Sequence, residues 1–189
     1  MIRELIIKNR SYRRFIESEK ISSEQLLTWI DLGRLSASGR NAQPIKYIVS
    51  CEVEKNAKIY SCLAWAAFLT DWDGPEEGER PSAYIIQLLD TVIANQFFCD
   101  DGIAAQSILL GAVEDGYGGC IFRSINKKRL TQLLEIPVQY EIINVIALGK
   151  PAETVVIEEM NGNDFKYWRD ENGVHHVPKR SLDELILKL

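Results

Sequence analysis

Three arginines and a serine lie close together near the start of the chain, where residues 10–15 read Arg-Ser-Tyr-Arg-Arg-Phe. The guanidinium group is a planar fork of donors that stays charged at any working pH, so arginine suits the recognition of a phosphate. A serine hydroxyl adds a further donor. The alternative is a solvated basic turn beside a helix. This stretch alone therefore indicates either an anion site or an exposed basic turn.

Two further stretches carry groups that suit ligand binding. Residues 38–44 read Ser-Gly-Arg-Asn-Ala-Gln-Pro, so a hydroxyl and two amides directly precede an apolar segment. The proline biases Gln43 towards an extended backbone. Residues 115–120 read Asp-Gly-Tyr-Gly-Gly-Cys and follow a segment of small residues. Each stretch also has a structural explanation, because amides before a proline are common in turns and a glycine after a helix is a common C-cap.

Composition limits the classes of protein to consider. With 189 residues the chain has room for one domain with a substantial core, or for two small ones. A net charge of −5 argues against broad binding to nucleic acid or to a membrane surface. We find no signal-peptide pattern and no apolar run of membrane-spanning length. The four cysteines form no CxxC pair, so we expect reduced thiols, a cytoplasmic protein and no metal site.

Hydrophobic periodicity predicts the elements that position these stretches. A helix that begins at Ser22, with Gln25 completing a capping box, has Leu26, Leu27, Ile30 and Leu35 on its predicted buried face. Further helices are predicted at residues 2–8, 54–65, 101–114, 126–134 and 181–189. Strands are predicted at residues 45–51, 83–89, 118–122 and 142–148, with an acidic loop over residues 70–81. This alternation by itself is also compatible with a doubly wound α/β fold.

The order and spacing of the three stretches resemble the FMN-dependent nitroreductase family. That family shows Arg-Ser-x-Arg-x-Phe near the N-terminus, then Ser-x-x-Asn-x-Gln-Pro, then a helix that ends in Gly-x-Gly. The resemblance extends from Ile2 to about Leu187. It implies an α+β fold, a three-layer sandwich whose central, mainly antiparallel sheet is flanked by helices, in an intertwined homodimer. Residues 1–189 would form a single domain, with 152–189 as a C-terminal arm that packs on the partner subunit.

The resemblance also implies which residues contact FMN. Four groups near the chain ends would bind its phosphate, a loop from the partner would contact its ring, and two glycines would bring backbone N–H groups close to the ring. The phosphate contacts would be Arg10, Ser11 and Arg13 with Lys179 or Arg180. The loop from the partner would supply Ser38, Asn41 and Gln43, and the two glycines would be Gly118 and Gly119. Arg14 falls at a variable position of the motif. His175 and His176 lie in a polar tail, and we expect both at the surface.

The activity implied by the resemblance is that of an FMN oxidoreductase. NADH or NADPH would reduce the flavin, and a small conjugated acceptor such as a nitroaromatic or a quinone would then take the electrons in a ping-pong cycle. We assign no catalytic acid or base, because the flavin supplies the chemistry. Ile45 replaces a frequent Trp, and Gly119 a frequent Ser or Thr, which leaves a relative with an unusual substrate open. A flavin-storage or redox-sensing protein and a flavin-free interaction domain are the alternatives.

Overall fold

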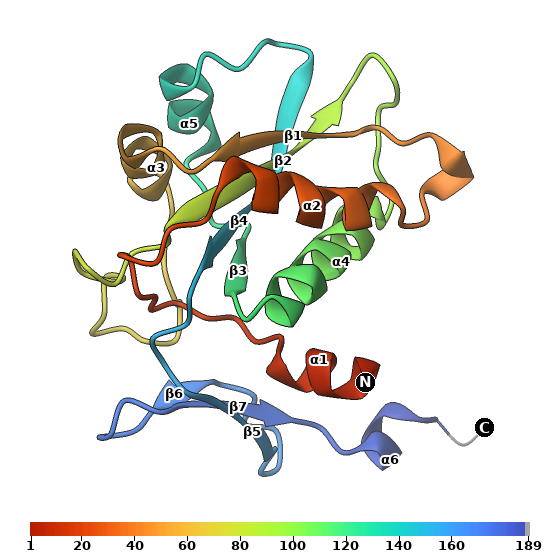
Figure 1. The fold of residues 1–189 in the computed structure, drawn as a ribbon. Coiled ribbons are helices and arrows are strands. Elements are labelled where there is room, and N and C mark those ends of the chain that lie inside the picture. Colours follow the sequence, from red (N-terminus) through yellow and green to blue (C-terminus); the bar gives the residue numbers. More distant parts are fainter. Residues whose placement is uncertain (188–189) are drawn as a thin grey trace.

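The computed structural model describes residues 1–187, and its centre is a four-stranded sheet (Figure 1). The strands lie in the order β1 (Ile45–Ser50), β2 (Ala83–Asp90), β4 (Tyr140–Gly149) and β3 (Gly118–Phe122). Every neighbouring pair is antiparallel. Each residue of β2 is buried, as expected for an inner strand covered on both faces. The antiparallel pairing makes the fold α+β and excludes the doubly wound alternative.

Helices cover both faces of this sheet. On one face, α2 (Ser23–Arg34) and α4 (Asp100–Glu114) pack against each other and share a core that includes Trp29, Ile85 and Ile108. The other face carries α3 (Val53–Tyr60) and α5 (Lys127–Leu133). Adjacent residues of β2 point to opposite faces, so Ile85 and Ile86 lie in different cores. The result is the predicted three-layer sandwich.

The helix that follows Ser22 shows both a confirmed and a wrong prediction. Ser22 Oγ accepts a hydrogen bond from the Gln25 backbone N–H and the Gln25 side chain accepts one from Ser22 N–H, which completes the capping box. Leu26 is buried as predicted, but Leu27 and Leu35 are 58% and 65% exposed. Trp29 fills the interior instead, and its indole N–H donates to Asp115 at 2.7 Å. Leucine periodicity by itself therefore predicts the wrong buried face, because the helix buries Trp29 and exposes Leu27.

Most other element boundaries agree with the predictions. Helix α1 (Ile2–Lys8), helix α4 and strand β3 lie where the sequence indicates, and Gly116, with a φ of 80°, follows the C-cap residue Asp115 and ends α4. The third helix is shorter than predicted, because the chain leaves α3 after Tyr60. No helix in the described part of the chain is both long and apolar enough to cross a membrane.

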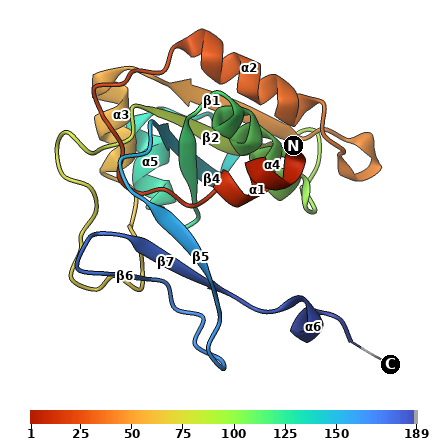
Figure 2. The same ribbon diagram turned by 60° about the horizontal axis from the view of Figure 1, so that its bottom comes forward.

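A second, smaller sheet was missed by the sequence analysis. It contains β5 (Val155–Glu159), β7 (His175–Lys179) and β6 (Trp168–Arg169), in that order, and lies beside α1 in Figures 1 and 2. Strands β5 and β7 are parallel, although only fifteen residues separate Glu159 from His175. The final helix is a single turn, α6 (Leu182–Leu185), and the predicted positions 188–189 fall outside the described residues.

The small sheet is anchored on its own chain by aromatic contacts. The Tyr167 ring lies 5.0 Å from that of Phe68, and the Arg169 guanidinium lies 4.8 Å from the centre of the Trp72 ring. Both loop partners belong to the segment between α3 and β2. That segment therefore supports the C-terminal sheet, while packing of residues 152–189 on a partner subunit stays a prediction.

Candidate anion and cofactor site

A cavity of about 300 Å³ lies between the segment that follows α1 and strand β7; we call it the β7 cavity. Alternate residues of β7 face it, as the two-residue period of a strand requires. Its lining comprises Asn9, Arg10, Ser11, Arg13, Tyr167, His175, Val177 and Lys179. The structure thus brings together residues from the two ends of the chain, including four of the predicted site residues.

The lining of the β7 cavity is cationic. Arg10, Arg13 and Lys179 contribute positive charge, and the lining includes no Asp or Glu. Arg10 Nη2 donates to the Ile6 carbonyl at 2.7 Å, while its Nε is buried without a hydrogen-bond partner in the described part of the chain. Unpaired donors beside several cations favour an anionic group with many acceptor oxygens, such as a phosphate.

A buried carboxylate fixes the backbone of the arginine segment. Glu153 Oε1 accepts hydrogen bonds from the backbone N–H groups of Arg13 and Arg14, at 2.5 and 3.2 Å. Its other oxygen pairs with Arg169 at 3.0 Å, and the Glu153 side chain is only 1% exposed. Tyr12 N–H donates to the Gly119 carbonyl at 3.1 Å. The segment is therefore held from β3 on one side and from the small sheet on the other. Neither Glu153 nor Arg169 was identified from sequence.

The structure shows which of the basic residues considered from sequence line the β7 cavity. Arg14 binds Glu79 of the acidic loop and does not line the cavity, in agreement with its variable position in the motif. Lys179 lines the cavity. Arg180 follows the end of β7 and instead contacts Asn163 at 3.3 Å and Glu184 at 3.5 Å. Of the two basic residues that the sequence left open, Lys179 is the one at the cavity.

The prediction that His175 lies at the surface is wrong. Its side chain is 1% exposed, and its Nε2 lies 3.2 Å from Nη1 of Arg13. Burial, together with the positive charge of Arg13, lowers the pKa of His175 to about 4. The spacing His175-x-Val177-x-Lys179 has the period of a strand and would have indicated one common face, but the polar composition of the tail concealed it.

The two predicted glycines are buried in β3 for reasons of packing. A Cβ on Gly118 would lie 2.5 Å from the Tyr12 ring, and a Cβ on Gly119 would lie 2.4 Å from the Ala147 carbonyl oxygen. Both positions therefore require a residue without a side chain. Contact of their N–H groups with a flavin ring stays a prediction.

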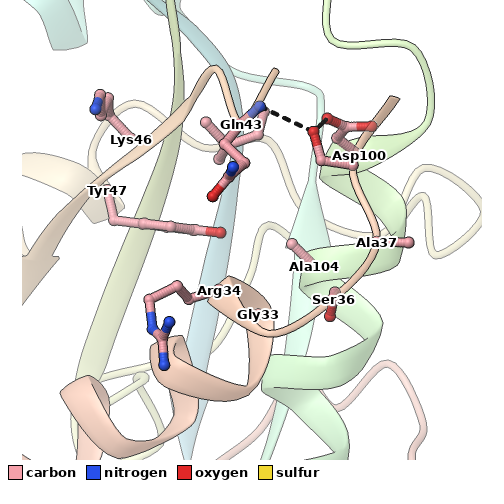
Figure 3. A pocket seen from close by; sticks show the side chains of 11 residues that line it. Gly33, Arg34, Ser36, Ala37, Gln43, Lys46, Tyr47, Asp100 and Ala104 are labelled. Atoms are coloured by element: carbon pink, nitrogen blue, oxygen red, sulfur yellow. Dashed lines mark hydrogen bonds between the residues drawn. The ribbon is translucent and has the colours of Figure 1, made fainter. Parts of the chain in front are cut away.

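The loop that carries Ser38, Asn41 and Gln43 is built on the start of α4. Asp100 accepts hydrogen bonds from Ser38 Oγ at 2.6 Å and from Gly39 N–H at 2.8 Å. Ser38 Oγ in turn accepts from Gln43 N–H at 2.9 Å (Figure 3). The predicted extended backbone at Gln43 is wrong, since its φ is 51°. The side-chain bond from Ser38 holds this tight turn and overrides the preference that Pro44 imposes.

A second cavity, of about 270 Å³, lies beside this loop (Figure 3). Ser38 and Gln43 line it together with Tyr47, whose phenol points into it, whereas Asn41 does not. In both Figure 1 and Figure 2 the loop lies well away from strand β7. Within one chain, the predicted flavin contacts in the β7 cavity therefore lie far from those in the Ser38 loop.

Comparison with known proteins identifies the family. The family model described as Nitroreductase family matches residues 6–150, which contain the arginine segment, the Ser38 loop and both glycines. The chain belongs to the nitroreductase family. No curated protein matches its sequence.

Solved structures share the nitroreductase fold. A nitroreductase family protein from Streptococcus pneumoniae TIGR4 has a TM-score of 0.71 at 19% identity, with both chains fully covered. An FMN-dependent nitroreductase from Clostridium difficile R20291 has a TM-score of 0.65 at 23% identity, over 87% of this chain and 92% of its own. A family member from Clostridium novyi NT has a TM-score of 0.64 at 22% identity, over 80% and 86%. At these identities the likeness establishes the fold.

Proposed function

We propose that this nitroreductase family member is an FMN-dependent oxidoreductase whose β7 cavity holds the FMN phosphate. The observation that carries the proposal is the convergence of Arg10, Arg13 and Lys179 on one cavity whose lining includes no carboxylate. Ser11 adds a hydroxyl beside them. A dianionic phosphate monoester fits this set of donors, because charge-assisted hydrogen bonds are the strongest that a protein offers to such a group. A structural relative named as FMN-dependent supports the choice of flavin.

The flavin ring would extend from the phosphate towards β3. Gly118 and Gly119 are adjacent to the arginine segment, and an isolated bridge joins Ser11 to Gly119. Backbone N–H groups near the ring would stabilise negative charge on the reduced flavin. When bound, FMN would accept a hydride from NADH or NADPH and supply electrons to a small conjugated acceptor such as a nitroaromatic or quinone. The residues of the chain bind and orient it, and we assign no acid or base to them.

The remaining contacts would come from a second copy of the chain. Ser38, Asn41 and Gln43 lie away from the β7 cavity within one chain, so they reach a flavin only across a subunit interface. Exposed apolar side chains on α1, α2 and α4 are available for this contact. They include Ile2, Ile6, Leu27, Leu32 and Ile103, with Leu35 directly after α2. We therefore propose a homodimer in which each flavin site contains residues of both subunits.

An absorption spectrum with an FMN titration tests the cofactor assignment. Purified protein mixed with FMN and desalted should retain flavin absorbance, and aerobic NADH or NADPH oxidation should accelerate when a quinone is added. Absence of bound flavin after reconstitution would contradict the proposal. Flavin that binds but is not reduced by either nicotinamide would instead indicate the storage or redox-sensing alternative.

A further inference from the structure

The proposed function assigns no role to His175, one of the residues that line the β7 cavity. His175 lines this cavity, although its side chain is only 1% exposed. Its backbone N–H donates to the Thr154 carbonyl at 2.9 Å, which fixes its place in the small sheet. Burial of an imidazole costs free energy unless its polar atoms are paired. In the described part of the chain Nε2 has one partner, the guanidinium of Arg13 at 3.2 Å, whereas Nδ1 is buried without one.

The chemistry of this contact determines the state of the ring. A guanidinium has five N–H donors and no acceptor, so Nε2 of His175 must be the acceptor. The imidazole is then neutral and carries its proton on Nδ1. The pKa of about 4, lowered by burial and by the charge of Arg13, agrees with a neutral ring at physiological pH.

The contact restrains a side chain that would otherwise be flexible. Arg13 Nη1 also donates to the Ser11 carbonyl at 3.1 Å, and the guanidinium lies 4.6 Å from the centre of the Tyr167 ring. Three neighbours therefore hold one guanidinium, and Arg13 is 9% exposed. An arginine loses substantial rotamer freedom when it is immobilised. If this rotamer freedom is already lost during folding, its entropic cost does not reduce the affinity for the ligand.

We propose that His175 is a positioning residue that accepts a hydrogen bond from Arg13 and so orients this guanidinium towards the phosphate of FMN. The inference rests on the proposed function and adds to it a residue outside the arginine motif. His175 acts on the phosphate through Arg13.

The charged groups around His175 explain why a neutral acceptor is needed there. Arg13 faces the ring from the segment after α1, Arg169 lies on β6, and His176 is the next residue of β7; all three lower the pKa of His175. The Tyr167 ring lies 5.2 Å away, and Glu153 is paired with Arg169. A proton on Nε2 would place two donors against each other, and protonation of both ring nitrogens would add a second positive charge, so in either case the restraint on Arg13 would be lost.

Two variants and two flavins test the role of His175. His175→Leu removes the acceptor, whereas in His175→Gln the side-chain oxygen can accept in place of Nε2. Riboflavin lacks the phosphate and serves as the matched ligand. His175→Leu should weaken FMN binding by about tenfold, the scale of one hydrogen bond, and leave riboflavin affinity within about twofold. His175→Gln should keep FMN affinity within about threefold of the wild type.

Several outcomes would overturn this role. Unchanged FMN affinity in His175→Leu, or an equal loss for FMN and riboflavin, would show that the residue has no positioning role. If His175→Leu does not fold, ¹⁵N NMR of the wild-type ring decides the question, because an Nε2–H tautomer at pH 7 contradicts the proposal and an Nδ1–H tautomer supports it. A wild-type protein that binds neither flavin would overturn the proposed function itself, which is a distinct result.

Discussion

His175 and His176 are adjacent in the sequence but have opposite electrostatic surroundings. His175 Nε2 lies 3.2 Å from the guanidinium of Arg13. His176 instead stacks on Trp168, with its Nδ1 2.5 Å from Glu158 and its Nε2 3.4 Å from Asp170. Burial lowers the pKa of the first ring to about 4, and the hydrogen bond with Glu158 raises the pKa of the second. Successive residues of one strand thus favour different protonation states.

This pair predicts two opposite dependences of stability on pH. In the unfolded chain His175 is protonated below about pH 6.5, whereas in the folded protein it is protonated only below about pH 4. Between these two pH values the unfolded state binds more protons, so the contribution of His175 to the free energy of unfolding should rise with pH. The raised pKa of His176 means that its contribution is fully present below 6.5 and is lost as pH rises through the folded pKa.

Urea unfolding of the wild type, His175→Leu and His176→Gln between pH 4.5 and 8.5 would measure both contributions. The stability difference between wild type and His175→Leu should grow up to about pH 6.5 and then stay constant. The difference between wild type and His176→Gln should stay constant at low pH and shrink at high pH. Parallel curves for the three proteins would contradict the assignment of the two protonation states.

The arginine motif predicts a large effect of one substitution and a small effect of its neighbour. Arg13→Ala should weaken FMN binding by roughly 1.5–3 kcal/mol, the usual scale of a hydrogen bond to a charged group. Arg14→Ala is the matched control, because Arg14 binds Glu79 and does not line the β7 cavity. Fluorescence titration of FMN measures both affinities. Equal affinities for the Arg13 variant and the wild type would show that the phosphate binds elsewhere.

Lys179 and Arg180 form a second matched pair. Lys179→Ala should reduce FMN affinity by about tenfold, because it removes one cation from the cavity. It should also reduce the dependence of FMN affinity on salt concentration, since fewer charges then face the phosphate. Arg180→Ala should leave both quantities close to the wild type, because its side chain contacts Asn163 and Glu184. If Arg180→Ala weakened FMN binding more than Lys179→Ala, the phosphate contact would belong to Arg180 and the assignment to Lys179 would be wrong.

A shared flavin site predicts complementation between defective subunits. Arg13→Ala and Asn41→Ala homodimers should each bind FMN weakly, since every site would lack one contact. In a mixed dimer, one of the sites combines Arg13 from one subunit with Asn41 from the other and is intact. Co-refolding the two variants should therefore restore tight binding to about a quarter of all sites if subunits exchange at random. No restoration would mean that each site belongs to a single chain, or that the protein is not a dimer.

The sequence predicted the main sheet well because its signals are local. An apolar run such as residues 83–89 and a capping box such as Ser22 with Gln25 each depend on neighbouring residues. The small sheet was missed because its strands are short and half-exposed, with little hydrophobic contrast. The family motif gave Arg10 and Arg13, but Glu153 and His175 contact the motif from more than 130 positions away. Such contacts depend on topology, which no local pattern encodes.

The contact between Arg13 and His175 joins residues 162 positions apart. The main sheet is complete once the chain has reached Gly149, whereas the β7 cavity needs strand β7, which ends at Lys179. Formation of contacts so distant in sequence carries a large loop-closure entropy, so the cavity is expected to assemble late in folding. A phosphate bound in this cavity would then link the segment that follows α1 to strand β7. A higher concentration of FMN would accordingly slow proteolysis of the C-terminal sheet.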